Sequence, residues 1–385
     1  MACTISPFPP LALYIHFPWC VRKCPYCDFN SHALKPGGAP EVAYVAALLA
    51  DLEQALPQAA GRPLASIFIG GGTPSLLSPE GLERLLAGVR ALSPLAADAE
   101  ITLEANPGTI DTGRFAAYRA SGVTRVSVGV QSLNDELLRR IGRIHGRADA
   151  LRAIEVAARH FDTWNLDLMY ALPGQTLAQA AEDLATALSF APPHLSCYHL
   201  TLEPNTAFYH SPPVLPEDDL SADMQDSLEE RLQAAGYVHY ETSAFARPGH
   251  HCRHNLNYWL FGDYLGIGAG AHAKITGPQG IHRETRRRHP EAYLEAAGQG
   301  DFVQTRQTVE AGELPFEFMM NALRLLAGVP ASLFEQRTGL TLEAIDAPLR
   351  QARERGLMLA DPQMLAPTEL GRRFLNDLLE IFLEH

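Results

Sequence analysis

Short apolar runs alternate with longer stretches of helical periodicity through the first half of the chain. The strand-like runs, rich in β-branched residues, occupy residues 11–16, 66–69, 100–104, 125–130, 165–170 and 194–202. Between them, apolar residues recur with helical spacing over residues 40–56, 79–92, 112–120, 148–160 and 177–190. Repeated β–α units predict an α/β fold, with a parallel sheet and helices on its outside. We expect a partial, TIM-like (β/α)6 barrel, with its site at the carboxyl ends of the strands.

The pattern loosens after about residue 202. One more helix is expected over residues 219–235 and a strand over 237–241, and the chain up to about residue 310 is expected to be loop-rich. We therefore expect a core barrel at residues 1–240, a connecting segment at 241–309 and a separate module at 310–385.

The last segment alternates helices with short strands. Helices are expected at residues 316–326, 331–338, 342–355 and 368–383, and two strands at 357–360 and 364–366. This pattern is typical of a winged-helix-like fold. Residues 310–385 contain seven Arg, no Lys and twelve acidic residues, a net charge of −5, whereas DNA-reading domains are basic. We expect a structural or interaction module.

The acidic net charge of the chain argues against partners that are themselves strongly anionic. The formal net charge is −13, which favours neither nucleic acids nor an anionic membrane surface. The chain has no apolar run of transmembrane length, and its N-terminal stretch lacks the basic residues of a signal peptide. We therefore expect no nucleic-acid partner, no transmembrane segment and a cytoplasmic location.

Three of the six cysteines form a CxxxCxxC motif directly after the first strand-like run. They are Cys20, Cys24 and Cys27. A structural zinc site usually has four ligands, and no second Cys or His pair follows nearby, although zinc remains the alternative. Three thiolates can hold three irons of a 4Fe–4S cluster and leave the fourth iron open to a small molecule with amino and carboxylate groups. Cys3 and Cys197 are expected to be inert.

The cysteine motif carries a family resemblance. CxxxCxxC with an aromatic residue before the third cysteine, here Tyr26, resembles the signature of radical S-adenosylmethionine (SAM) proteins. The wider string YIHFPWC…CPYCDFNSH resembles the HemN-type oxygen-independent coproporphyrinogen III oxidases and their relatives, the HemW-type heme chaperones. The resemblance extends over nearly the whole chain, including the C-terminal module.

A glycine-rich string follows the second strand-like run. Consecutive glycines allow a backbone to approach a ligand closely, although such a string alone is also found in plain tight turns. Gly71, Gly72 and Thr73 resemble the GGTP loop of radical SAM proteins, which implies contact with the amino group of SAM.

Further polar residues in or near strands match SAM-contacting positions of the resembled family. They are Tyr14, Glu104, Gln131, Arg143 and Asp167. A carboxylate can accept from ribose hydroxyls or pair with a cationic group, and an Arg can hold a carboxylate with two hydrogen bonds. Each alone can also be a strand-end residue with satisfied hydrogen bonds.

Two features separate the heme chaperones from the oxidases. Phe29 occupies the place where the oxidases typically have a further cysteine, and we include it among the cofactor-binding residues. The oxidases also have a longer N-terminal extension, whereas thirteen residues precede Tyr14 here. Both features favour a heme chaperone, with an oxidase as the alternative and a related radical enzyme acting on another substrate as a third, and no catalytic residue is assigned.

The string HNxxYW resembles the motif of HemW-type proteins and comprises His254, Asn255, Tyr258 and Trp259. Imidazole can bind heme iron, and aromatic rings can stack on a porphyrin. His254 is the leading candidate ligand, followed by Cys252 and Tyr258. The alternative is that His254 and Asn255 brace a loop over the SAM pocket.

Remaining expectations concern a basic patch and the partners. Arg283 and residues 286–288 are expected to form a small patch that either meets heme propionates or belongs to a solvated loop. The resemblance implies heme, heme-acceptor proteins and a reductant for the cluster as partners, and a homodimer is left open.

Overall fold

Six parallel strands, adjacent in chain order, form the centre of the sheet. They are β1 (Leu11–Phe17), β4 (Leu64–Gly71), β5 (Leu95–Ala105), β6 (Arg125–Gln131), β7 (Thr163–Tyr170) and β8 (His194–His199). The computed structural model describes residue 5 and residues 7–383. The strands are mostly buried, as parallel strands covered on both faces must be, although the first half of β5 is partly exposed. All six predicted strands are confirmed, although the last ends at His199 rather than at residue 202.

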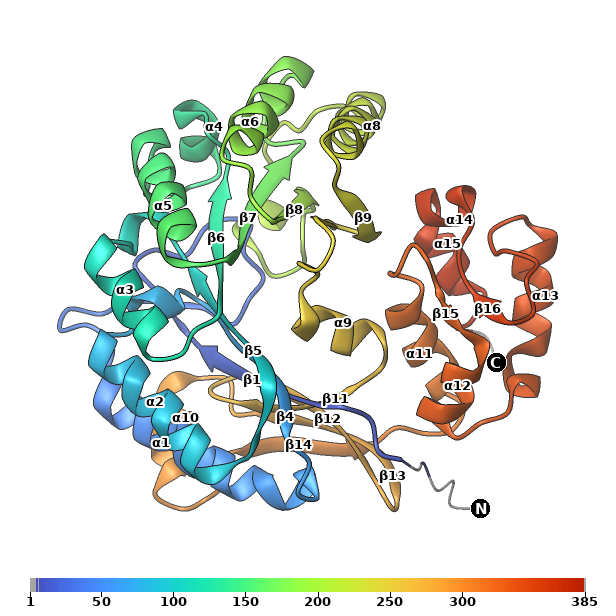
Figure 1. Ribbon diagram of the computed structural model, residues 1–385, viewed down its shortest axis with the longest axis horizontal. Helices are drawn as coiled ribbons and strands as arrows, with labels where there is room; N and C mark the ends of the chain where they lie inside the picture. Colours follow the sequence, from blue (N-terminus) through green and yellow to red (C-terminus); the bar gives the residue numbers. More distant parts are fainter. Residues whose placement is uncertain (1–4, 6, 384–385) are drawn as a thin grey trace.

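Helices cover the outside of this curved sheet (Figure 1). They are α1 (Glu41–Ala55), α2 (Pro79–Leu92), α3 (Thr112–Ala120), α4 (Asp135–Arg140), α5 (Arg147–His160), α6 (Leu177–Ser189) and α8 (Asp218–Ala234). Their starts follow from local sequence: Ser78 accepts a hydrogen bond from the backbone of Gly81, and Thr176 with Gln179 forms a capping box. None of the described helices is both long and apolar enough to cross a membrane.

The sheet continues at both ends. β10 (Ala244–Ala246) and β9 (Val238–Glu241) follow β8, and β11 (Asp263–Ile267) lies parallel to β1 on the other side. Three antiparallel strands complete that side: β12 (His272–Gly277), β13 (Gly280–Arg286) and β14 (Val303–Thr308). The order begins at β14 and ends at β9, so the barrel is open.

The expectation of a loop-rich stretch up to about residue 310 was wrong. That stretch contains β10 to β14 together with α9 (Arg253–Trp259) and α10 (Pro290–Ala297). The reason is that β14, with sequence VQTRQT, is mostly exposed, and β13 carries polar residues on both faces. These strands are held by pairing with their neighbours rather than by a continuous apolar run.

The C-terminal module has its own apolar core, which includes Phe318, Phe334 and Leu378. Its helices are α11 (Leu314–Ala322), α12 (Ala331–Thr338), α13 (Asp346–Glu354), α14 (Glu369–Arg373) and α15 (Leu375–Glu380). The expected hairpin is present as an isolated antiparallel bridge between Met358 and Pro367, with the backbone N–H of Leu359 donating to the Ala366 carbonyl at 3.0 Å. The expectation missed β15 (Val329–Pro330), which precedes α12 and pairs with β16 (Met364–Leu365). The expected final helix is interrupted at Phe374, whose backbone is not helical.

Short elements connect these parts. They are β2 (Trp19–Cys20), β3 (His32–Ala33), α7 (Ala207–His210) and the 3-10 turns Leu56–Ala59, Pro74–Leu76, Pro107–Thr109 and Leu342–Ile345. β2 and β3 pair with each other in a separate small sheet.

A buried ionic network joins α1 to the far side of the sheet. Asp51 accepts hydrogen bonds from Arg286 Nε (2.8 Å), from the hydroxyl of Tyr293 (2.8 Å) and from the backbone N–H of Gly268 (3.2 Å). Arg286 also donates to Glu284 at 2.8 Å. Because these side chains are almost fully buried, each charge depends on its partners.

We predict that Asp51→Ala lowers the free energy of unfolding by about 3–5 kcal/mol, because it leaves the Arg286 guanidinium buried without its main partner. Asp98→Ala is the matched control, since Asp98 forms a solvent-exposed pair with Arg253 and its loss should cost below about 1 kcal/mol. Urea denaturation followed by circular dichroism measures both, and equal losses would contradict a special role for the buried network.

Candidate functional site

The cluster loop, residues 18–31, leaves the carboxyl end of β1 and carries the three motif cysteines. Trp19 and Cys20 form β2, which pairs with β3 at the end of the loop. The backbone N–H of Cys27 donates to the carbonyl of Cys24 at 3.2 Å and forms a turn between the two thiols. The Trp19 ring packs edge-on against Tyr44 of α1, with ring centroids 4.7 Å apart, and so anchors the start of the loop.

The glycine-rich turn after β4 holds the cluster loop in place. Gly72 donates its backbone N–H to the carbonyl of Phe17 at 2.7 Å, and Thr73 donates to that of Trp19 at 2.8 Å. A Cβ on Gly72 would lie 2.5 Å from the Trp19 carbonyl oxygen, and Gly71 has a φ of +111°. Only glycine permits this approach and this backbone conformation.

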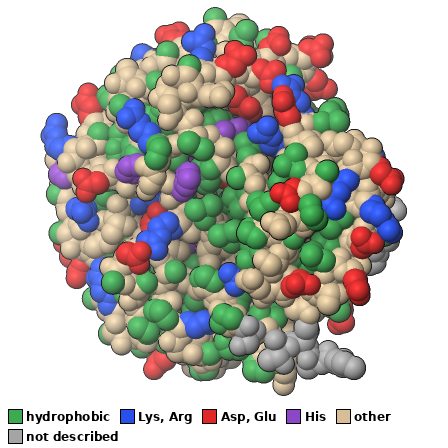
Figure 2. All heavy atoms as spheres, turned by 45° about the vertical axis from the view of Figure 1, so that its right-hand side comes forward, with side chains coloured by type: hydrophobic (Ala, Val, Ile, Leu, Met, Phe, Trp, Pro, Cys, Tyr) green, Lys and Arg blue, Asp and Glu red, His purple; other side chains and the backbone are tan. Residues whose placement is uncertain are grey.

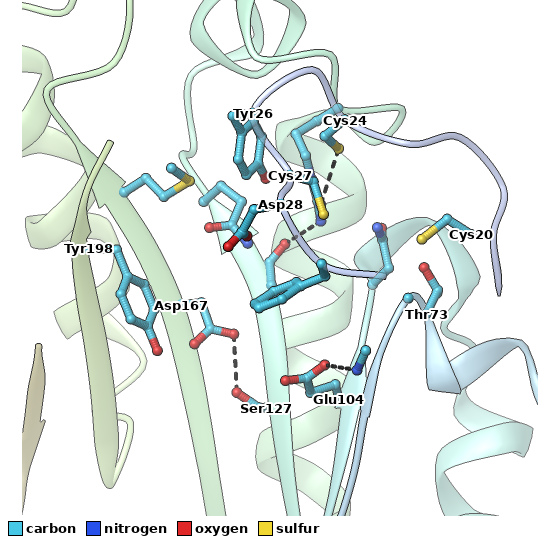
Figure 3. A pocket seen from close by; sticks show the side chains of 18 of the residues that line it. Cys20, Cys24, Tyr26, Cys27, Asp28, Thr73, Glu104, Ser127, Asp167 and Tyr198 are labelled. Carbon is cyan, nitrogen blue, oxygen red and sulfur yellow. Dashed lines mark hydrogen bonds between the residues drawn. The ribbon is translucent and has the colours of Figure 1, made fainter. Parts of the chain in front are cut away.

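A first cavity of about 410 Å³ lies between the cluster loop and the strand ends. Eleven of the residues predicted to bind the cluster or a cofactor line it: Cys20, Cys24, Cys27, Phe29, Gly71, Gly72, Thr73, Glu104, Gln131, Arg143 and Asp167. In Figure 3 the cysteines lie on the loop, while Glu104, Ser127 and Asp167 lie on the strands below it. The parallel sheet thus brings residues from distant parts of the chain to one edge.

Two carboxylates occupy the floor of this cavity. Glu104 accepts a hydrogen bond from the backbone N–H of Gly71 at 3.1 Å, and Asp167 accepts from Ser127 at 3.1 Å and from Asn165 at 2.8 Å. Burial and the nearby charge of Asp167 raise the pKa of Glu104 from 4.5 to about 8. Burial also raises the pKa of Asp167. A cationic group in this cavity would stabilise both carboxylates.

Arg143 and Gln131 form the wall on the β6 side. Arg143 donates to the carbonyl of Gly129 at 2.7 Å, and its Nη1 lies 3.8 Å from the sulfur of Cys24. Its Nε is buried and has no hydrogen-bond partner among the described residues. Gln131 has a φ of +68°, which is costly for a residue with a side chain and is typical of functional sites.

The cysteines fit a 4Fe–4S cluster better than a single metal ion. Within the described part of the chain, no group of three His, Cys, Asp or Glu side chains converges on one point. A cluster does not require such convergence, because each cysteine binds a different iron. Burial raises the pKa of the Cys20 and Cys27 thiols, so their thiolates need positive charge nearby, which irons supply.

The residues of the first cavity also fit SAM. SAM carries a carboxylate, an amino group, a sulfonium and ribose hydroxyls. The cavity offers the guanidinium of Arg143 for an anionic group and the carboxylates of Glu104 and Asp167 for cationic or hydroxyl groups. The free Nε of Arg143 and the two buried carboxylates are the polar groups that such a ligand would satisfy.

The HNxxYW string forms α9, and its members separate in space. His254 is buried, and both of its ring nitrogens are engaged, Nδ1 with Ser66 Oγ and Nε2 with the hydroxyl of Tyr258, each at 2.9 Å. Burial lowers the pKa of His254 to about 3. Neither His254 nor Asn255 lines the first cavity. Cys252 is also buried, 3.7 Å from Glu100.

A second cavity of about 750 Å³ lies on the other side of the cluster loop. Its lining includes Tyr14, Phe29, Tyr258 and Trp259. The expectation that Tyr14 lines the SAM cavity was therefore wrong, because Tyr14 faces the second cavity and not the first. Asp28 and Phe29 line both cavities.

The expectation that Arg283 and residues 286–288 form one basic patch was wrong. Arg286 is buried in the network with Asp51, Arg283 pairs with Glu317 and Arg287 pairs with Asp301. Only Arg288 is exposed and, among the described residues, has no ion pair. The physical reason is that β13 continues through residue 286, so successive arginines point to opposite faces of the sheet.

Sequence reasoning missed several residues of the two cavities. Arg22 lies within the cysteine motif and Asp28 directly follows it, while Ser127 lies on β6, next to the strand that carries Asp167. The polar identity of Ser127 within an apolar strand was the available signal. Tyr198 and His272 gave no such signal, because their places depend on β8 and β12 lying beside the site. Cys197 is buried in β8, and Cys3 lies outside the described residues.

Family comparisons divide the chain into two matched regions. Residues 14–187 match the radical SAM superfamily, and residues 309–374 match the HemN C-terminal domain.

Two relatives and one solved structure extend these matches to the whole chain. The heme chaperone HemW of Escherichia coli is 53% identical, covering 97% of this chain and 98% of that protein. The heme chaperone HemW of Haemophilus influenzae is 48% identical, covering 97% and 98%. The structure of coproporphyrinogen III oxidase (HemN) from Escherichia coli has a TM-score of 0.83 at 24% identity, covering 99% of this chain and 92% of that one. At this identity the likeness concerns the fold alone.

We predict that Gly72→Ala displaces the cluster loop and lowers the iron bound per chain after anaerobic reconstitution, because its methyl group would overlap the Trp19 carbonyl. Gly108→Ala is the matched control, since a Cβ there meets its nearest atoms at 3.7 Å. Iron and sulfide analysis measures the effect, and equal iron content in the two variants would contradict it.

We predict that the SAM-free protein loses stability as the pH rises from about 4.5 to about 8, because the raised pKa of Glu104 makes the folded chain hold a proton that the unfolded chain releases. In Glu104→Gln the new side chain cannot ionise, so the loss of stability with rising pH should be smaller. Glu182 is exposed on α6, so Glu182→Gln should lose as much stability as the wild type. Melting temperatures across this pH range test the prediction, which fails if both variants behave alike.

Proposed function

The chain belongs to the radical SAM superfamily and, within it, to the HemW heme chaperones, and from this premise we propose that it binds heme and transfers it to heme-acceptor proteins. The observation that carries the proposal is the 53% identity to a named heme chaperone over 97% of this chain. In this proposal the first cavity binds a 4Fe–4S cluster and SAM, the two cofactors of the radical SAM family.

The cluster ligands in this proposal are Cys20, Cys24 and Cys27. When bound, a 4Fe–4S cluster with one open iron supplies a coordination position for the amino and carboxylate groups of SAM and an electron for its reductive cleavage. The chain supplies the surroundings. Arg143 lies beside Cys24 and contributes positive charge next to a thiolate, and Thr73 lies on the turn that fixes the loop.

The SAM contacts follow from the charges of the cavity. Glu104 and Asp167 accept from hydroxyl or cationic groups, and the free Nε of Arg143 donates to an anionic group. Binding a cation next to Glu104 favours its ionised form and lowers its pKa from the raised value of the free site. Gly71 and Gly72, which line the cavity, let this turn pack closely against His16 and the Trp19 carbonyl.

The oxidase remains the alternative, and the cluster loop favours the chaperone. Phe29 occupies the place of the oxidases' further cysteine, and it is 59% exposed between two cavities. The strong similarity to the oxidase structure supports the shared fold and not a shared reaction.

His254 supports α9 in this proposal rather than binding heme iron. Its two ring nitrogens already bond to Ser66 and Tyr258, and its backbone N–H donates to Glu100 at 3.2 Å. Binding iron would require breaking at least one of these buried hydrogen bonds. A structural role for His254 is therefore better supported, although it holds α9 and not, as the sequence suggested, a loop over the SAM pocket.

The partners belong to the proposal as well. Heme and a heme-acceptor protein follow from the chaperone function, and a reductant is needed to supply the cluster with electrons. The cytoplasmic location, the homodimer and the division of the chain at residues 240 and 309 stay predictions.

We predict that anaerobically reconstituted protein, given SAM, a strong reductant and coproporphyrinogen III, forms no protoporphyrinogen, while the same preparation binds heme. A known coproporphyrinogen III oxidase in the same mixture is the positive control, and chromatography of the oxidised porphyrins is the measurement.

Cysteine variants connect this test to the cluster. Cys24→Ala should abolish the visible absorption of the cluster, whereas Cys197→Ala, buried in β8, should retain it. If the wild type converts coproporphyrinogen III and Cys24→Ala does not, the protein is an oxidase and the chaperone proposal is overturned.

A further inference from the structure

The floor of the second cavity is one face of the sheet. Alternate residues of four neighbouring strands contribute to it: Tyr14 and His16 from β1, Tyr264 from β11, His272 and Lys274 from β12, and Arg283 and Thr285 from β13. Side chains two residues apart on a strand point to the same face, which explains the pattern. The floor thus belongs to the part of the sheet that extends the barrel beyond β1.

The walls of this cavity are largely aromatic. Tyr258 and Trp259 of α9 form one side, Met320 and Asn321 of α11 another, and Phe29 of the cluster loop a third. Figure 2 shows hydrophobic side chains gathered where the barrel meets the C-terminal module. A volume of about 750 Å³ suits a small-molecule ligand of the size of a porphyrin, and its aromatic walls suit a flat apolar ring.

His272 is the free imidazole of this cavity. The structure gives its ring no hydrogen bond, ion pair or ring contact among the described residues, whereas His16 bonds to Tyr14 and to the Asn30 carbonyl. Burial and the positive charges of Arg283 and Arg288 lower the pKa of His272. Its imidazole is therefore neutral near pH 7, which is the state that binds a metal.

Two further polar groups at the cavity also lack partners. The guanidinium of Arg288 has no ion pair within the described part of the chain, while its neighbour Arg287 pairs with Asp301. The indole Nε1 of Trp259 is buried without a hydrogen-bond partner among the same residues. The other two basic side chains of the cavity form ion pairs, Lys274 with Asp263 and Arg283 with Glu317.

We propose that heme occupies this second cavity, with His272 binding its iron and Arg288 binding a propionate. The proposal rests on the heme-chaperone function and adds to it the place and the ligands of the heme. It replaces His254, whose ring nitrogens are both engaged, with a histidine that is free and lies in a cavity of suitable size. Tyr258 and Trp259 retain a part as walls of the site.

The experiment is a titration of the anaerobically purified full-length protein with hemin and, separately, with metal-free protoporphyrin IX. His272→Ala should weaken hemin binding by about 10–100-fold and remove the spectrum of imidazole-bound iron. It should leave protoporphyrin binding unchanged, because that ligand has no iron. Added imidazole should restore the spectrum.

Arg288→Ala tests the other end of the ligand. It should weaken both hemin and protoporphyrin by about tenfold, since both carry propionates, and leave the iron spectrum of bound hemin unchanged. His282→Ala and Arg287→Ala are the matched controls, because His282 bonds to Thr308 and Arg287 to Asp301, outside the cavity. The melting temperature and the cluster absorption of each variant verify its fold.

The outcomes separate this proposal from the function on which it rests. If the wild type binds hemin and His272→Ala retains both affinity and spectrum, the site is overturned and the chaperone function stands. Equal losses of hemin and protoporphyrin in His272→Ala would also overturn iron binding by this residue. If the wild type binds no hemin at all, the chaperone function fails, and the site fails with it.

Discussion

The close approach of the glycine-rich turn to the end of β1 is the contact on which the site depends. Two backbone hydrogen bonds, from Gly72 to Phe17 and from Thr73 to Trp19, fix the start of the cluster loop. Any side chain at Gly72 would push the two backbones apart. On the opposite side of the same turn, Gly71 packs against His16, which in turn holds the Asn30 carbonyl at the loop's end. Both ends of the loop are thus fixed by one pair of adjacent strands.

The protein buries charge in two different ways. Asp51 and Arg286 are paired with each other and hydrogen-bonded to further groups, so their network fixes the structure of the sheet extension. Glu104 and Asp167 instead face a cavity without an ion-pair partner among the described residues, and burial raises the pKa of both. Uncompensated buried charge costs stability, which is the usual condition of a site that awaits a ligand.

The features that the sequence predicted best are those that depend on a single continuous segment of the chain. The six central strands contain short, mostly buried apolar runs rich in β-branched residues, and the cysteine spacing placed three thiols on one loop, so both were predictable. The strands β13 and β14 are polar and half exposed, and the two-residue β15 pairs with β16 across 34 residues, so no local pattern revealed β13, β14 or β15. Whether a histidine is free is also a non-local property. The sequence singled out His254 and not His272, and only the positions of Ser66 and Tyr258 in the fold show that the ring nitrogens of His254 are engaged.

The shared wall between the two cavities links cluster binding to the proposed heme site. Asp28 and Phe29 line both cavities, and the side-chain amide of Asn30 donates to the carbonyls of Ala269 and Arg288 at 2.9 and 2.8 Å. The backbone of Arg288 is therefore tied to the loop that carries the three cysteines. Because a bound cluster restrains that loop through Cys20, Cys24 and Cys27, it also restrains the wall and one rim of the second cavity. In this arrangement the proposed heme site is ordered by the same loop that carries the three cluster cysteines.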